Sequence, residues 1–242
     1  MRTIIEYLKY SYQKILNTPQ ITFTLSRKYW STVVINESNE QLVKIQETEK
    51  IKILPIKDLY EASVLVRKNI YDRLLIASSF LPEGYYFGII EGYRNIEQQQ
   101  KSWDKTIEKI KKEFPAWSTE KIIHEASLIS ARPNILANHN CGGAIDLTLL
   151  DANGNQYDMG TLYPNENTNM NERKKFPMYA KNISQEQKRN RAILRNTMTS
   201  AGFVYYPGEW WHYCYGDRMW AVYTRRKECV YGPVQNFPSN LI

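Results

Sequence analysis

Two histidines and an aspartate, with a glutamate close to the second histidine, are the residues of this sequence best suited to chemistry. His139 and Asp146 lie in one stretch, and Glu209 precedes His212 by three residues in another. Two imidazoles and one carboxylate leave a fourth position of Zn²⁺ free for water, which is typical of a catalytic zinc site. The Glu209 carboxylate could take a proton from that water. The residue types therefore predict metal-assisted hydrolysis.

One arginine is a further candidate for catalysis, whereas the third histidine and two cysteines are not. Hydrolysis of an amide needs a cation beside the oxygen that gains charge, and Arg94, at the end of a predicted strand, is the candidate. His124 is expected to be a structural residue. Cys141 and Cys214 are expected to be bystander thiols, because a fourth protein ligand would close the metal site to water.

The chain around these residues must bend to bring them together. Gly142-Gly143 permits a sharp turn that would fold His139 over Asp146. Residues three apart in a regular strand point to opposite faces, so Glu209 and His212 would diverge there. The preceding Pro207-Gly208 indicates a turn that extends through Glu209, which would aim both side chains at one metal.

Hydrophobic periodicity predicts an α+β fold with a small sheet flanked by helices. Helices are expected from Asp58 to about Leu81 and over residues 102–113, 119–129 and 184–201. Strands are expected over residues 32–35, 86–90, 144–149 and 203–206, and from Trp210 onward, with a hairpin partner of 144–149 near Gln156. The predicted domains are an N-terminal extension packed on the core (1–57), the catalytic domain (58–228) and a C-terminal tail (229–242).

Composition narrows the class of protein. The net charge of +7 is concentrated in a basic stretch over residues 172–191, with no recognition helix or aromatic platform, so nucleic-acid binding is not expected. No apolar run approaches the ~20 residues of a membrane span. The three cysteines and the lack of an evident signal peptide favour a cytoplasmic protein, and a processed, exported form stays open.

These segments together resemble the zinc D-alanyl-D-alanine dipeptidases. The resemblance rests on the runs Ala137-Asn-His-Asn-Cys-Gly-Gly-Ala-Ile-Asp146, Glu209-Trp-Trp-His212, Glu91-Gly-Tyr-Arg94 with Gln99, and Asp158-Met-Gly-Thr161. It implies one zinc ion on His139, Asp146 and His212, with Glu209 as the base and Arg94 as the oxyanion partner. It also implies a zinc D,D-peptidase (hedgehog-like) fold, a small antiparallel sheet flanked by helices, and release of free D-alanine from D-Ala-D-Ala-type dipeptides.

Two departures from the family pattern concern specificity and leave alternatives open. Ala137 replaces a serine. The run after Met-Gly reads Thr161-Leu-Tyr-Pro164-Asn-Glu166, so the Asp that suits a substrate ammonium is absent or shifted to Glu166. A D,D- or L,D-carboxypeptidase acting on longer peptidoglycan stem peptides is therefore the second hypothesis. A zinc-stabilised binding module without turnover is the third. The sequence assigns no substrate-binding residue and no oligomeric state.

Overall fold

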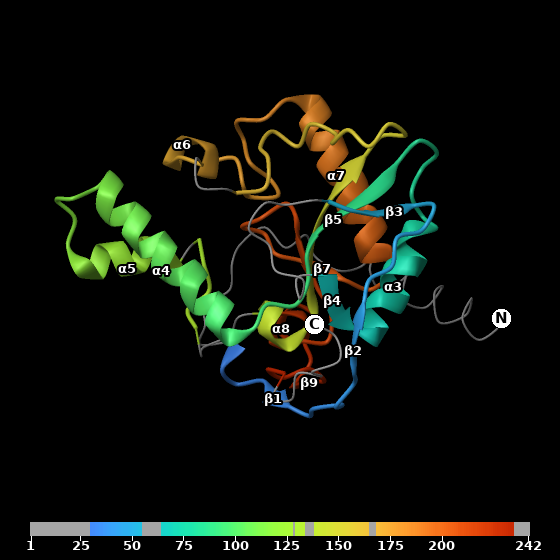
Figure 1. The fold of residues 1–242 in the computed structure, drawn as a ribbon, viewed down its shortest axis with the longest axis horizontal. Helices are drawn as coiled ribbons and strands as arrows, with labels where there is room; N and C mark the ends of the chain where they lie inside the picture. Colours follow the sequence, from blue (N-terminus) through green and yellow to red (C-terminus); the bar gives the residue numbers. More distant parts are fainter. Residues whose placement is uncertain (1–29, 55–63, 128, 134–137, 165–167, 235–242) are drawn as a thin grey trace.

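The computed structural model describes residues 30–54, 64–127, 129–133, 138–164 and 168–234, and they form an α+β fold as predicted (Figure 1). The central sheet has the strand order β3-β5-β6-β8-β7. Its strands are β3 (Ile51–Ile53), β5 (Tyr86–Glu91), β6 (Ala144–Leu150), β8 (His212–Cys214) and β7 (Val204–Tyr205). The β3–β5 pair is parallel and the other pairs are antiparallel, so the sheet is small and mainly antiparallel.

β6 lies at the centre of this sheet, and all of its residues are buried. Ile145, Leu147 and Leu149 share one face and belong to the main hydrophobic core. That face is covered by α3 (Lys68–Ser78) and α7 (Gln185–Ser200), which contact each other. The opposite face of β6 carries Ala144, Asp146 and Thr148, as the alternation of the sequence predicted.

The start of α7, at a side-chain cap, agrees with the prediction from the sequence, whereas the start of α4 does not. α7 starts after Ser184, whose hydroxyl accepts the N–H of Gln187 in the predicted capping box, and Gly202 follows the helix with φ of +89°. α4 (Ile96–Glu113) starts six residues earlier than predicted, because Asn95 and Gln98 form a second capping box. α5 (Thr119–Ser127) follows it.

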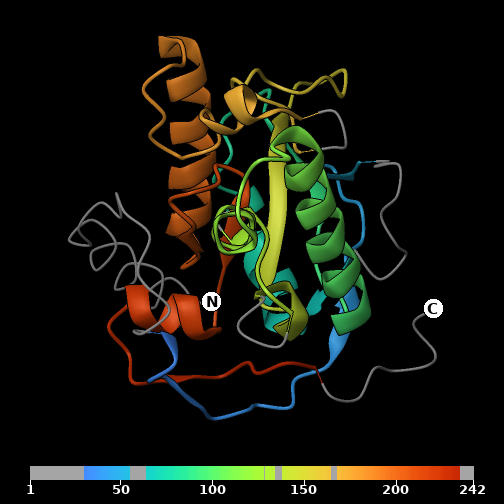
Figure 2. The same ribbon diagram turned by 90° about the vertical axis from the view of Figure 1, so that its left-hand side faces the viewer.

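The α4–α5 pair forms a helical hairpin with a small apolar cluster of its own, which includes Ile110, Ile122 and Ala126. Figure 1 shows this hairpin on the side of the sheet opposite α3 and α7, and Figure 2 shows α4 in front of the long strand β6. The start of α4 therefore lies on the face of the sheet that carries Asp146. Two short helices are also described, α6 (Met170–Arg173) and α8 (Arg218–Tyr223).

Segments from both ends of the described chain join the central body. β1 (Val34–Ile35) pairs in parallel with β9 (Glu228–Cys229), and β2 (Leu42–Lys44) pairs with β4 (Leu65–Arg67). Strands β1, β2 and β3 thus each bond to a strand beyond residue 57. The division into an extension (1–57), a catalytic domain and a tail stays a prediction.

Arg67 connects these terminal segments to the middle of the chain. Its guanidinium donates to the carbonyl oxygens of Cys141 (2.8 Å) and Gly232 (3.3 Å), and it pairs with Glu37 (3.3 Å). The N–H of Val234 donates to the carbonyl of Asn140 at 2.9 Å. The residues after β9 therefore support the backbone beside His139.

Three predicted elements differ in the structure. The helix expected from Asp58 begins at Lys68, because residues 65–67 form strand β4; Asp58 itself lies outside the described residues. The predicted hairpin partner of β6 is reduced to one antiparallel bridge between Gln156 and Leu150, and the strands that pair with β6 are β5 and β8. The strand expected over residues 32–35 is shortened to β1.

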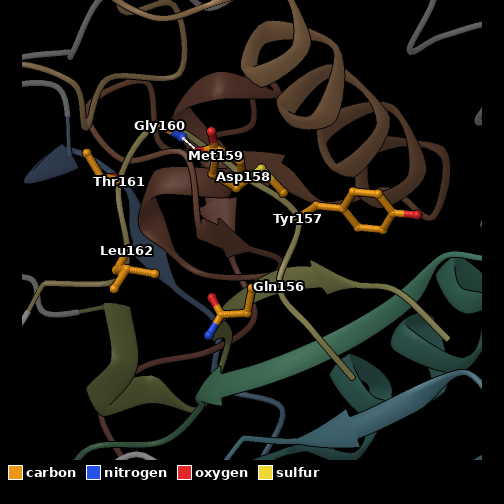
Figure 3. Close-up of a pocket in the computed structure, with 7 residues that line it drawn as sticks. All are labelled: Gln156, Tyr157, Asp158, Met159, Gly160, Thr161 and Leu162. Atoms are coloured by element: carbon orange, nitrogen blue, oxygen red, sulfur yellow. Dashed lines mark hydrogen bonds between the residues drawn. The ribbon is translucent and has the colours of Figure 1, made fainter. Parts of the chain in front are cut away.

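The segment after β6 lines a cavity of about 320 Å³ (Figure 3). The Asp158 carboxylate beside this cavity accepts hydrogen bonds from the backbone of Gly160 and from Gln187. Its partners make Asp158 a turn-forming residue. Among the helices that the structure describes, each is too short or too polar to cross a membrane.

Candidate active site

Three polar side chains lie in a row across the open face of the central sheet. Strand register places Glu91 of β5 opposite Asp146 of β6, and Asp146 opposite His212 of β8. Directly paired residues on neighbouring strands point to the same face with their Cβ atoms about 5 Å apart. The sheet therefore brings the Glu91, Asp146 and His212 side chains together from distant parts of the sequence.

Glu91 joins this row because β5 is irregular at its end. The register shifts between Ile89, which pairs with Leu147, and Glu91, which pairs with Asp146. In a regular strand Glu91 would share the face of Ile89 and point into the core. The extra residue, Ile90, turns the Glu91 carboxylate to the face of Asp146 instead.

His139 reaches the row from the short 3₁₀ helix η2 (Asn138–Cys141), which lies directly before β6. Its Nδ1–H donates to the carbonyl of Gly92 at 2.6 Å, and its own carbonyl accepts the N–H of Arg94 at 3.2 Å. The ring is therefore oriented with Nε2 toward Asp146, and Nε2 keeps its lone pair for a metal.

The two glycines after η2 have the role that the sequence predicted. Gly142 has φ of +68°, and a Cβ on Gly143 would lie 2.8 Å from the carbonyl oxygen of Tyr215. Larger residues would be strained at the first position and would collide with backbone at the second. The pair thus allows the sharp bend that sets His139 against β6.

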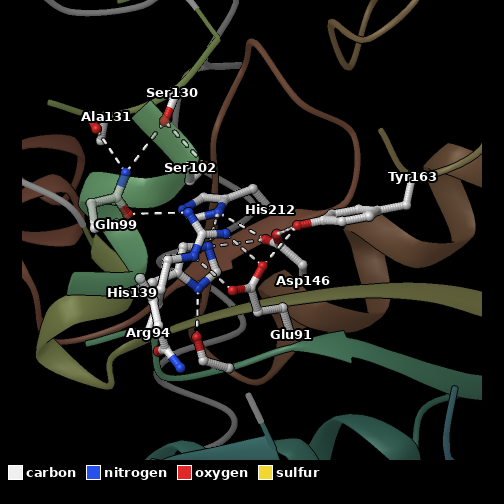
Figure 4. Close-up of polar contacts among 12 residues, drawn as sticks. Glu91, Arg94, Gln99, Ser102, Ser130, Ala131, His139, Asp146, Tyr163 and His212 are labelled. Atoms are coloured by element: carbon white, nitrogen blue, oxygen red, sulfur yellow. Dashed lines mark hydrogen bonds and ion pairs between the residues drawn. The ribbon is translucent and has the colours of Figure 1, made fainter. Parts of the chain in front are cut away.

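The ligand atoms of His139, Asp146 and His212 converge as a metal site requires (Figure 4). Asp146 Oδ1 lies 2.9 Å from His212 Nδ1 and 3.5 Å from His139 Nε2, and the two nitrogens are 3.2 Å apart. Ligand atoms of a tetrahedral zinc ion are about 3.3 Å apart, given bond lengths near 2 Å. The buried group thus fits a zinc ion with one position left for another ligand.

Glu209 lies in a turn, as the Pro207-Gly208 signal predicted. Its N–H donates to the carbonyl of Tyr206, and its carbonyl accepts the N–H of His212 at 3.4 Å. Burial raises the pKa of the half-buried Glu209 carboxyl to about 7, although the nearby His212 opposes the shift. A carboxylate with a pKa near neutrality is suited to accept and return a proton.

Arg94 is held on the other side of the row by its neighbours. Its Nε and Nη2 donate to the two oxygens of Glu91, at 2.7 and 2.5 Å, and its Nη1 donates to Gln99 Oε1 at 3.1 Å. Gln99 in turn donates to the carbonyl of Ala131. Burial alone would raise the pKa of Glu91, but Arg94 lowers it below its usual value. The guanidinium is therefore fixed and charged, with further N–H groups left for a ligand.

Sequence reasoning missed two residues of this network. Glu91 is part of the recognised run Glu91-Gly-Tyr-Arg94, but no role was predicted for it. Tyr163 lies two residues after the recognised Thr161, and its hydroxyl contacts both Glu91 Oε2 (2.9 Å) and Asp146 Oδ2 (3.1 Å). The available signal was a position inside a recognised run for Glu91 and a position close to one for Tyr163.

The other singled-out residues are placed apart from the metal group or outside the described chain. Cys141 Sγ donates to the carbonyl of Asn138, and Cys214 is buried near Asp217. His124 is exposed on α5. Ala137 and Glu166 lie outside the described residues.

Comparisons with known proteins place the chain in a family. Residues 53–232 match the profile of the D-Ala-D-Ala dipeptidase family. A D-alanyl-D-alanine dipeptidase of Synechocystis is 32% identical over 180 residues, which are 61% of this chain and 68% of that protein. A D-alanyl-D-alanine dipeptidase of Escherichia coli is 42% identical over 77 residues, 32% of this chain and 37% of that protein.

A solved structure is similar over most of its length. The vancomycin-resistance D,D-pentapeptidase VanY, in complex with Zn(II), covers 83% of this chain and 96% of its own, with a TM-score of 0.45 and 18% identity. The family match over residues 53–232 defines the present protein as a metallopeptidase. This chain belongs to the D-Ala-D-Ala dipeptidase family.

Proposed function

We propose that this protein is a zinc-dependent dipeptidase that hydrolyses D-Ala-D-Ala-type dipeptides to free D-alanine. The observation that carries the proposal is the convergence of His139, Asp146 and His212 on one buried point beside Glu209 and Arg94. Family membership and the names of the two curated relatives support the substrate.

Under this proposal, His139, Asp146 and His212 would hold the metal, since their ligand atoms converge. When bound there, zinc lowers the pKa of water toward ~7 and polarises a carbonyl group. The Gly92 carbonyl orients the His139 ring through Nδ1, so that Nε2 stays available as a ligand. The row of paired strands fixes the other two ligands.

Glu209 transfers the proton, and Arg94 stabilises the developing negative charge. The Glu209 carboxylate accepts the proton of the attacking water and passes it to the leaving amine, and its pKa near 7 suits both transfers. The Arg94 guanidinium, fixed by Glu91 and Gln99, stabilises the negative charge that develops on the former carbonyl oxygen.

A comparison of a dipeptide with a stem pentapeptide tests which substrate length the enzyme prefers. The zinc-loaded protein is expected to release D-alanine from D-Ala-D-Ala faster than from a stem pentapeptide that ends in D-Ala-D-Ala, as measured by an amine-release assay. Faster cleavage of the pentapeptide would support the carboxypeptidase alternative instead. Absence of turnover on both substrates would contradict a D,D-peptidase activity.

Replacing Arg94 with lysine tests the oxyanion role. Lysine keeps a positive charge opposite the buried Glu91 but cannot form the two parallel bonds that fix the guanidinium. We expect kcat to fall about 100-fold, since one oxyanion contact contributes roughly 3 kcal/mol to the barrier. Steady-state kinetics at saturating zinc measures the change. Arg195→Lys, at a partly buried position of α7 where the guanidinium contacts Tyr179 and Asn196, is the matched control. Equal rates for both variants would contradict the assignment.

A further inference from the structure

Tyr163 lies between the metal group and the carboxylate that holds Arg94. Its hydroxyl oxygen is 3.1 Å from Asp146 Oδ2 and 2.9 Å from Glu91 Oε2 (Figure 4). Asp146 and Glu91 come from neighbouring strands, while Tyr163 comes from the segment after β6. One phenol group thus connects a predicted metal ligand with the partner of the predicted oxyanion residue.

The ring of Tyr163 is held by aromatic neighbours next to Glu209. It makes an edge contact with Trp211, with ring centres 5.5 Å apart. Two residues before it, Thr161 Oγ1 accepts a hydrogen bond from the indole of Trp210 at 2.9 Å. Both tryptophans are buried, so the position of the hydroxyl is set by packing and not by its two polar contacts alone.

The two oxygens of Asp146 face different partners. Oδ1 faces the ring nitrogens of His139 and His212, and Oδ2 faces Tyr163. Glu91 already accepts two hydrogen bonds from Arg94. A phenol has one proton to donate. An ordinary phenol, with a pKa of ~10, keeps this proton at neutral pH.

We infer that Tyr163 is a positioning residue for the metal, because its hydroxyl holds Asp146 by Oδ2 and thereby keeps Oδ1 toward the two imidazoles. The inference rests on the proposed zinc site. Hydrogen bonds to the far side of a ligating carboxylate orient the ligand, and their loss commonly weakens metal binding 10- to 100-fold.

Tyr163→Phe tests this inference, because it removes one oxygen and keeps the ring against Trp211. We expect its zinc dissociation constant, measured by competition with a chromophoric chelator at fixed pH, to rise about 10- to 100-fold. The zinc concentration that gives half-maximal peptidase activity should rise by the same factor. Thermal unfolding of the metal-free proteins shows that the variant remains folded.

Tyr179→Phe is the matched control. The Tyr179 hydroxyl also has two polar contacts, to Tyr205 (2.9 Å) and Arg195 (3.1 Å), but these residues take no part in the metal group. The zinc affinity of Tyr179→Phe should equal that of the unchanged protein. Equal zinc affinity in Tyr163→Phe would overturn the inference and leave the proposed function intact. Failure of the unchanged protein to bind zinc would overturn both.

Discussion

Replacing Glu209 with glutamine is expected to lower kcat for D-Ala-D-Ala by between about 100-fold and 10,000-fold, because the amide cannot accept a proton from water. The ligand group of His139, Asp146 and His212 does not include Glu209, so zinc should remain bound. Amine-release kinetics gives the rate, and elemental analysis of the same samples gives the zinc content.

The control for this variant is Glu83→Gln, which changes an exposed glutamate in the turn before β5. It should retain full activity. A Glu209→Gln protein that contains zinc and turns over at the unchanged rate would exclude Glu209 as the base. Loss of zinc from that variant would instead place Glu209 among the ligands.

Replacing Asp146 with asparagine is expected to abolish stoichiometric zinc binding and, with it, peptidase activity. The amide has the same size but lacks the negative charge that the two imidazoles face at 2.9 and 3.5 Å. Burial would raise the pKa of Asp146, but His139 and His212 hold that pKa well below its usual range. Elemental analysis after supplementation and dialysis measures the loss.

Asp151→Asn provides the comparison, since Asp151 directly follows the same strand and is a partly exposed turn residue that accepts the N–H groups of Asn153 and Asn155. Asparagine can accept these bonds too, so zinc content and activity should be unchanged. Stoichiometric zinc in Asp146→Asn would show that this carboxylate is not required to hold the metal.

The candidate site was largely predictable because chemistry restricts residue type. His139, Asp146 and His212 were chosen for their ligand atoms, and the structure brings these three together. The turn at Glu209 followed from Pro207-Gly208. Tyr163 was not predictable in this way, because its role depends on where its ring packs and not on a pattern of spacing.

The fold was predictable where local signals dominate. The capping box at Ser184 correctly predicts the start of α7. The prediction does not use the similar box at Asn95, so it starts α4 too late. The helix predicted from Asp58 included residues 65–67, whose pairing with β2 overrides their helical spacing. The position of Glu91 required knowledge of the bulge at Ile90, since a period of two points its side chain into the core.

The hydrogen bond from Val234 to Asn140, together with the contacts of Arg67, has a practical consequence for shortened versions of the protein. A truncated chain that stops at residue 228, at the predicted end of the catalytic domain, would lack the segment on which the His139 loop rests. Expression plasmids intended for crystallisation or metal assays should therefore encode the chain at least through Val234, with any purification tag joined beyond it.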